Sequence, residues 1–570
     1  MPTPAASTTS STDGFSDWFA VWRNPIALAH GRPQLRRGGL IAWSVVTVSV
    51  VAFIFFFAYL TLTRRGEWDP ATAARLTIGP LFVVQCVLLM GKGTAAVAAG
   101  IVKDREAGTL DYHRMTPMPA HAKILGYLFG LPARAYFLFA LTLPFLAYAV
   151  WRGGVAPLRV LHLYAVFFTS VWMYHLFGLM VGMIAKKPKQ STLASSGLVV
   201  TLYLVVPGLA RLGLSFLEFL TVRPTFYGMV AQEVQDVAWW GHAEGLASRF
   251  AAVQFFGFEV NPTLFTLIVQ GLAITVLVHV VRRKWTDPSW HAMSKRFALL
   301  FFVAVGVLLV GSLWPHLQGR AVYDRLNLQS LLTTDRGALL SMGAVFFGVV
   351  AAAALFVVSM ATPRAVIARR GLRRARKDGH PRVPGGWDAA SSLPLTLAVL
   401  VLGAVALVAA AGAWNAGERA ALSADLWGWA ALLLALAAGV LLTFQALHER
   451  LGKGPVILLG FVAWAVPFMV AIVLAAAFGQ HNAAIYAAVP CAPVTGALAL
   501  AELTIAYGDG ELGRSLRKDF PAARFAMFAG VVFYGVLAVL TQAWRWRWAA
   551  AMRRQEFDGP PADASAPAGA

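Results

Sequence analysis

The chain has 570 residues, of which 58% are hydrophobic and 13% are charged, and its mean hydropathy is +0.65. This composition excludes a soluble globular protein and is typical of a polytopic membrane protein. The net charge of +21 invites a nucleic-acid interpretation, but the Lys and Arg residues gather at the ends of apolar runs, so we expect no nucleic-acid partner.

The first 38 residues precede any apolar run that is long enough to span a bilayer. Residues 1–14 are mostly Ser, Thr, Ala and Pro without a basic region before a short apolar core, so we expect a disordered start and no cleaved signal peptide. Phe15, Trp18, Phe19 and Trp22 then recur at helical spacing, which predicts an amphipathic helix in the membrane interface. The alternative is an ordinary anchoring helix without a role in transport.

Twelve apolar runs are long enough to cross a hydrocarbon layer of about 30 Å. They lie at residues 40–62, 76–102, 124–150, 160–185, 192–210 and 263–281, and then at 297–314, 338–360, 393–413, 426–447, 455–478 and 522–544. The sequence therefore predicts an all-α polytopic membrane protein of about twelve transmembrane helices, in two six-span halves at residues 39–290 and 291–550. We expect the tail at 551–570, which is rich in Pro and Ala at its end, to be disordered.

The orientation follows from the basic residues of the short loops. With the N-terminus inside, most Lys and Arg clusters fall on the cytoplasmic side, as the positive-inside rule requires. A further apolar stretch at 483–507 would make thirteen spans, and we predict that it is a re-entrant or interfacial pair because Pro490 and Pro493 interrupt it. Both termini are then cytoplasmic, and we expect the bacterial cytoplasmic (inner) membrane.

The two predicted halves end alike. Residues 282–285 read R-R-K-W and residues 544–548 read W-R-W-R-W, so we expect both last spans to place Trp and basic residues, Arg545 among them, at the membrane interface. Parallel repeats of this kind imply a pseudo-two-fold axis along the membrane normal. One chain would then supply both halves of a transport pathway.

A dense charged segment follows the second predicted span, where residues 103–117 read K-D-R-E-A-G-T-L-D-Y-H-R-M-T-P. These charges cannot lie in hydrocarbon, where each costs about 2.5–3.5 kcal/mol at a helix centre. Pro117 and Pro119 interrupt the backbone that follows, so the segment predicts a short surface helix between two spans. From the residues alone, the alternative is a solvated loop whose charges only set the topology.

The order D-R-E-A-G-T-L-D, followed by T-P, resembles the signature of type-2 ABC transporter permeases, the membrane subunits of one class of ATP-driven exporters. The resemblance in span order covers residues 15–285, and N-P-I-A-L-A-H-G-R-P at 24–33 is similar to the family's N-terminal segment. It implies a coupling helix at 103–115 that fits a cleft on a separate cytosolic ABC ATPase, expected as a dimer that binds ATP and Mg²⁺. The residues to which the resemblance assigns this coupling are Asp104, Arg105, Glu106, Gly108, Thr109, Leu110, Asp111 and Pro117.

The equivalent place in the second half departs from this pattern. Residues 361–383 are rich in Arg and nearly without acids. These cations suit anionic lipid headgroups or an acidic surface, but they cannot repeat the role of Glu106. We therefore predict that coupling to the ATPase is one-sided.

No signature of catalysis is present. The G-K-G-T at residues 91–94 lacks the earlier Gly of a phosphate-binding loop, and neither H-E-x-x-H nor G-x-S-x-G occurs. We therefore expect no catalytic residue, metal or cofactor in this chain. Lys92, Arg134 and His175 are ionisable residues in predicted spans and so are candidate pathway residues, although Lys92 could instead snorkel to the interface.

The expected function is that of an ABC permease subunit, with export favoured by the resemblance. One alternative is an ion-coupled secondary transporter of twelve spans, which the near absence of acidic residues in the predicted spans disfavours. The other is a non-transporting membrane assembly protein with a permease fold. The substrate stays open, because such spans suit lipids, peptides, polysaccharides and drugs equally.

Overall fold

The computed structural model describes residues 20–64, 69–185, 187–211, 214–233, 252–287, 290–318, 335–416, 424–497 and 522–558. Within these ranges eleven helices are long and apolar enough to cross a membrane, and a bent pair brings the number to as many as twelve. The strands described are β1 (Val253–Phe255) and β2 (Phe258–Val260), which form a two-stranded sheet. The predicted class, an all-α polytopic membrane protein, is confirmed.

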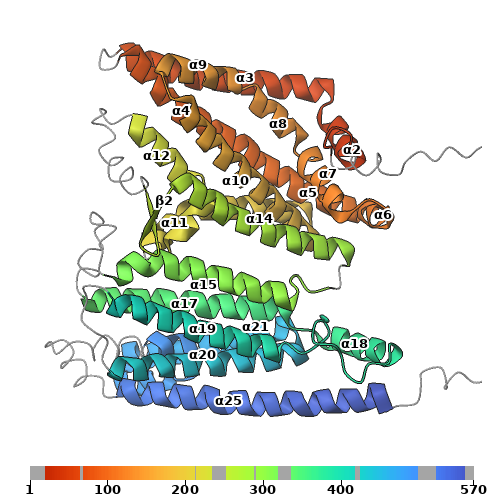
Figure 1. The fold of residues 1–570 in the computed structure, drawn as a ribbon, viewed down its shortest axis with the longest axis vertical. Coiled ribbons are helices and arrows are strands. Elements are labelled where there is room, and N and C mark those ends of the chain that lie inside the picture. The colour runs from red at the N-terminus through yellow and green to blue at the C-terminus, as the bar shows by residue number, and fades with distance from the viewer. Residues whose placement is uncertain are drawn as a thin grey trace, which may run out of the picture. The chain divides into compact units, whose positions relative to one another are not determined.

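The chain forms two compact units, which divide between Ser289 and Trp290 except that Leu212–Leu214 and Phe255–Gly257 belong to the second unit. The helices of the first unit are α2 (Pro25–Gln34), α3 (Arg37–Arg64), α4 (Pro70–Cys86), η1 (Val87–Gly93), α5 (Thr94–Glu106), α6 (Thr109–Met115), α7 (Ala120–Gly130), α8 (Ala133–Ala140), α9 (Leu143–Gly153), α10 (Pro157–Ile184), α11 (Pro188–Arg211), η2 (Ser215–Leu220), α12 (Arg223–Glu233) and α14 (Pro262–Thr286). Within this unit α2, α6 and α7 gather at one end of the long helices (Figure 1).

Helix α10 is central to the first unit and packs against α5, α11 and α14. Gly178 and Gly182 of α10 stand four residues apart, and a Cβ added to either would lie within 3 Å of a backbone oxygen of α5, that of Thr94 or Ala98. Small residues at this spacing let two helix backbones approach closely, which strengthens packing where both helices lie in lipid. The backbones of α5 and α10 are therefore in close contact at the centre of the unit.

Local sequence signals account for several helix starts. The Asn24 side chain accepts hydrogen bonds from the amides of Ile26 and Ala27 at the start of α2. Asp69 accepts one from the Thr72 amide at 2.7 Å, and that bond lowers the pKa of the Asp69 carboxyl. In both helices Pro follows the cap, where its fixed φ suits the first turn.

Two of the predicted spans differ from a continuous α-helix. The run at 124–150 is divided into α7, α8 and α9, and the stretch long enough to span is Ala133–Gly153. Pro132 and Pro144 supply no backbone donor at these breaks, which explains the interruption. The run at 76–102 contains the π-helical segment η1 between α4 and α5.

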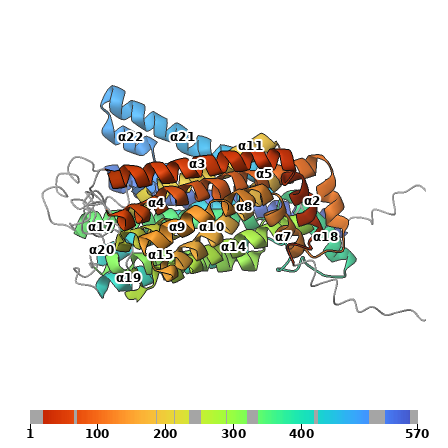
Figure 2. The ribbon, with the colours of Figure 1, turned by 90° about the horizontal axis from the view of Figure 1, so that it is seen from above.

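The second unit contains α15 (Lys295–Leu317), α17 (Asp335–Ala361), α18 (Ala365–Lys377), α19 (Leu393–Asn415), α20 (Ala424–Leu451), α21 (Lys453–Phe478), α22 (His481–Ala487), α25 (Ala522–Arg553) and η4 (Arg554–Asp558). Helices α20 and α25 pack against each other, and α17 and α18 form the bent pair, with an angle of 51°. In this unit α22 follows α21 at its end (Figure 2).

Some predicted segments are described only in part. Helix α22 ends before Pro490, and the rest of the predicted pair from residue 498 onwards lies outside the described residues, as do Phe15, Trp18 and Phe19. Trp22 lies in a turn just before α2. The helical structure of α25 and η4 continues to Asp558, beyond the predicted start of the tail at 551, and Arg373 of α18 contacts it there by binding Glu556 at 2.7 Å.

Candidate functional site

The charged segment at 103–117 forms a sharp corner between α5 and α6. Gly108, at the corner, has φ +74°, a conformation that is costly for residues with a Cβ. Leu110 points into the unit and is only 1% exposed, in a cluster with Ile101 and Trp285. At this corner the chain thus turns at Gly108 into the short helix α6, which Leu110 anchors in the apolar interior.

A polar network joins α6 to α2, α5 and α7. The Tyr127 hydroxyl donates to Asp104 Oδ2 at 2.6 Å, and His30 Nε2 lies 3.1 Å from the same oxygen. His113 Nδ1 of α6 lies 2.9 Å from the Tyr127 hydroxyl oxygen. Since the tyrosine proton is directed to Asp104, Nδ1 of His113 must carry a proton to complete this bond. Four helices therefore meet around one carboxylate.

Burial lowers the pKa of His113, an effect partly offset by the nearby Asp104 carboxylate and reinforced by His30 and Lys123. Lys123 of α7 is buried and donates to the Thr116 carbonyl at 3.0 Å, just after α6 ends. Burial also lowers the pKa of Lys123. A cation at this place stabilises the negative end of the α6 dipole.

Arg105, the residue after Asp104 on α5, binds the end of α10. Its guanidinium donates to the carbonyls of Gly182 at 3.2 Å and Met183 at 2.9 Å, and also to that of Ala185. The last carbonyls of a helix lack intrahelical partners, so this contact closes the end of α10. Asp104 and Arg105 therefore bind within the unit, although the resemblance assigned both to a partner.

The outer face of the corner combines acidic and apolar side chains. Glu106, Asp111 and Pro117 are exposed, and Tyr112 and Met115 are 65% and 79% exposed. Asp111 also pairs with Arg114 at 2.5 Å on the same helix. The remaining predicted coupling residue, Thr109, is half-buried. This face offers carboxylates, an aromatic ring and a flexible thioether to a partner.

The three candidate pathway residues, Lys92, Arg134 and His175, each contact a different partner. Lys92 is exposed, and its ammonium group lies 3.8 Å from the centre of the Trp43 ring. Arg134 donates to the Gln34 carbonyl at 2.9 Å.

His175 is fully buried, with Nε2 3.0 Å from the Leu89 carbonyl oxygen and Nδ1 3.4 Å from the Tyr136 hydroxyl. A Cβ on Gly93 would lie 2.6 Å from His175 Nε2, so this glycine is required for the close approach.

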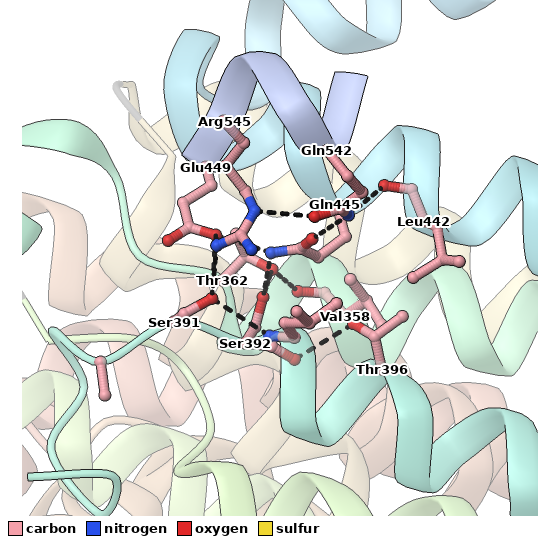
Figure 3. Close-up of polar contacts among 12 residues, drawn as sticks. Val358, Thr362, Ser391, Ser392, Thr396, Leu442, Gln445, Glu449, Gln542 and Arg545 are labelled. Carbon is pink, nitrogen blue, oxygen red and sulfur yellow. Dashed lines mark hydrogen bonds and ion pairs between the residues drawn. The ribbon is translucent and has the colours of Figure 1, made fainter. Parts of the chain in front are cut away.

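A second polar network, which was not predicted, lies in the second unit (Figure 3). Glu449 of α20 and Arg545 of α25 are 3.4 Å apart and each side chain is 6% exposed. Ser391 and Gln445 donate to Glu449 at 3.2 and 2.6 Å, and Arg545 donates to Gln542 at 2.8 Å. The pair is therefore buried with most of its hydrogen-bonding groups satisfied.

This network corrects two sequence-based interpretations. The predicted span at 426–447 stopped short of Glu449, whereas α20 continues to Leu451, so a carboxylate does lie within a candidate membrane helix. Arg545 was interpreted as an interface residue from its Trp-rich surroundings, but it is buried. The i, i+4 spacing of Gln445 and Glu449 was the available sequence signal.

His30, Lys123 and Tyr127 were also missed as members of the site. Nothing local in the sequence connects them to Asp104 of α5, because His30 lies on α2 and the other two lie on α7. No group of three or more potential metal ligands occurs among the described residues. No protein-family model matches the chain, and no curated protein or solved structure matches it at a significant level.

Proposed function

We propose that this polytopic membrane protein is the permease subunit of an ABC-type exporter, and that the α5–α6 corner couples it to a separate cytosolic ATPase. The observation that carries the proposal is that the corner has one side anchored in the first unit and another side exposed. Leu110 and the Asp104 network hold it to the transmembrane helices, while Glu106, Tyr112 and Met115 are exposed. A solvated loop that served only topology would need no such anchor.

The contacts suggest how a push on α6 would reach the membrane. Tyr127 and His113 connect α6 to α7, and Arg105 connects the end of α5 to the end of α10. Because α5 and α10 pack through Gly178 and Gly182, a displacement of α6 moves both helices together. ATP and Mg²⁺ bind to the partner ATPase, and this chain contributes the coupling helix and the translocation pathway.

An ion-coupled secondary transporter is the second candidate, and Glu449 is the observation that favours it. A carboxylate within a membrane helix is a functional candidate by default. Its close pairing with Arg545 and two neutral donors suits a structural role better, since a coupling carboxylate must bind and release the coupling ion during the cycle. We therefore place this function second.

The test is to purify the protein from its native membrane in mild detergent and to measure whether an ATP-hydrolysing subunit accompanies it. Glu106→Ala should abolish coupled transport and weaken association, with normal membrane insertion. Glu259→Ala in β2 removes another exposed acid and serves as the matched control. Unchanged coupling in Glu106→Ala would show that the α5–α6 corner is only a loop whose charges set the topology. Transport driven by an ion gradient without any ATPase would favour the secondary transporter instead.

A further inference from the structure

A cavity of about 250 Å³ lies in the first unit, where α10, α12 and α14 begin. Its lining includes Arg159, His162, Thr225 and Asn261, together with Leu158 and Met229. In this unit the starts of α10 and α14 lie at the opposite end from α6 (Figure 1). The cavity is therefore separate from the corner that we assign to coupling.

Thr225 is the feature that indicates a ligand. Its side chain lines the cavity and is only 7% exposed, yet its hydroxyl oxygen has no hydrogen-bond partner among the described residues. Buried hydroxyl groups in proteins are nearly always bonded, because an unmet group keeps its full desolvation cost. A bound polar group would remove that cost.

The charge around Thr225 selects an anion. Arg159 and His162 stand three residues apart on α10 and so share one face of the helix. The cap of α10, Ala156, has no side chain that can accept from the first amides, so no side chain offsets the positive end of the helix dipole, although the Arg159 amide donates to the Ala156 carbonyl at 3.0 Å. No Asp or Glu is among the described residues that line the cavity. Arg159 already has another interaction, so the site uses its charge and does not require a vacant donor.

The surroundings indicate a phosphate that carries an apolar body. Leu158 and Leu161, in the same turn of α10 as the two basic residues, are 62% and 64% exposed. A candidate membrane span begins at Pro157, so these leucines face the boundary between headgroups and hydrocarbon. A phosphate offers several acceptor oxygens to an imidazole N–H and a hydroxyl, and its negative charge is attracted by the guanidinium of Arg159.

We propose that this cavity binds one phosphate group, supplied by an anionic phospholipid headgroup or by a soluble phosphate. The site needs neither the ATPase nor the coupling corner. Its failure and the failure of the proposed function are therefore distinguishable by binding alone.

The experiment measures binding of phosphatidylglycerol, phosphatidylcholine and inorganic phosphate to the delipidated full-length protein in detergent, by native mass spectrometry and thermal shift. Thr225→Val keeps the shape of the side chain and removes its hydroxyl, and we expect about tenfold weaker binding of phosphatidylglycerol. Arg159→Gln should weaken it at least as much. Thr77→Val, which removes a buried hydroxyl bonded only within α4, is the matched control and should bind like the wild type.

Preference for phosphatidylglycerol over phosphatidylcholine, lost in Thr225→Val, supports the site. Competition by inorganic phosphate would identify a soluble source, and its absence a lipid source. Equal binding of the two lipids together with no binding of inorganic phosphate, or wild-type affinity of both variants for every probe, would overturn the proposal. Because the Thr225 hydroxyl has no partner to lose, Thr225→Val should not lower the melting temperature of the ligand-free protein. That variant therefore decides the matter even if Arg159→Gln folds poorly.

Discussion

Replacing Tyr127 by Phe removes a single oxygen atom from the contact that holds α6 to the first unit. That hydroxyl donates to Asp104 at 2.6 Å and lies 2.9 Å from His113 Nδ1. Tyr127 is fully buried and the Asp104 side chain is 16% exposed, so water replaces the lost bond only in part. A hydrogen bond to a charged group contributes about 1.5–3 kcal/mol, and α6 should therefore open roughly 10- to 100-fold more often.

Hydrogen exchange of the backbone amides in α6 measures this opening in the full-length protein. Tyr127→Phe should speed exchange across α6 by the stated factor and leave α3 unchanged. Tyr112→Phe is the control, because that ring lies on α6 itself and is 65% exposed. Exchange in Tyr127→Phe that matches the control would refute the reasoning, since α6 would then be held by Leu110 alone.

Three further outcomes are expected. Gly108→Ala places a Cβ at φ +74° and should cost about 1–2 kcal/mol, measured as faster exchange in α6, and unchanged exchange would show that the corner tolerates a side chain. Arg545→Ala leaves the Glu449 carboxylate buried without its cation and should lower the unfolding free energy by about 3–5 kcal/mol. Arg545→Met combined with Glu449→Gln removes both charges and should recover most of that loss. A double variant as unstable as the single one would contradict this. The lowered pKa of His113 favours the neutral ring in the folded protein. The contribution of His113 to the stability of α6 should therefore be complete above the pKa of the unfolded chain, 6.5, and should decrease as the pH falls below that value. His113→Gln should remove this pH dependence, and a pH dependence that persists in the variant would assign it to another group.

The positions of the spans followed from the sequence because hydropathy is a local property. Predicted and observed helix ends agree within a few residues for most runs, as at 393–413 against α19. The break at Pro132 was readable in principle, but a proline within an apolar run either kinks a helix or ends it, and the neighbouring helices decide which.

The candidate site was predictable only on its exposed side. Glu106 and Asp111 stood out because charge after an apolar run must reach water. Asp104 has the same local pattern, yet it faces inward because Tyr127 and His30 come from other helices. Such pairings depend on tertiary packing and leave no periodic trace in the chain.

The π-helical segment at Val87–Gly93 sets the rotation of everything that follows it in that span. A π turn holds an extra residue, and each residue of an α-helix turns the chain by about 100°. A one-residue deletion inside this segment is absorbed, because the π turn then becomes an α turn. Deleting one residue of α5 before Asp104 would leave composition and hydropathy nearly unchanged, yet it would turn Asp104 away from Tyr127 and Arg105 away from the end of α10 by about 100°. In related sequences of this span we therefore expect one-residue gaps to fall within Val87–Gly93, and the number of residues from Thr94 to Gly108 becomes a property on which selection can act.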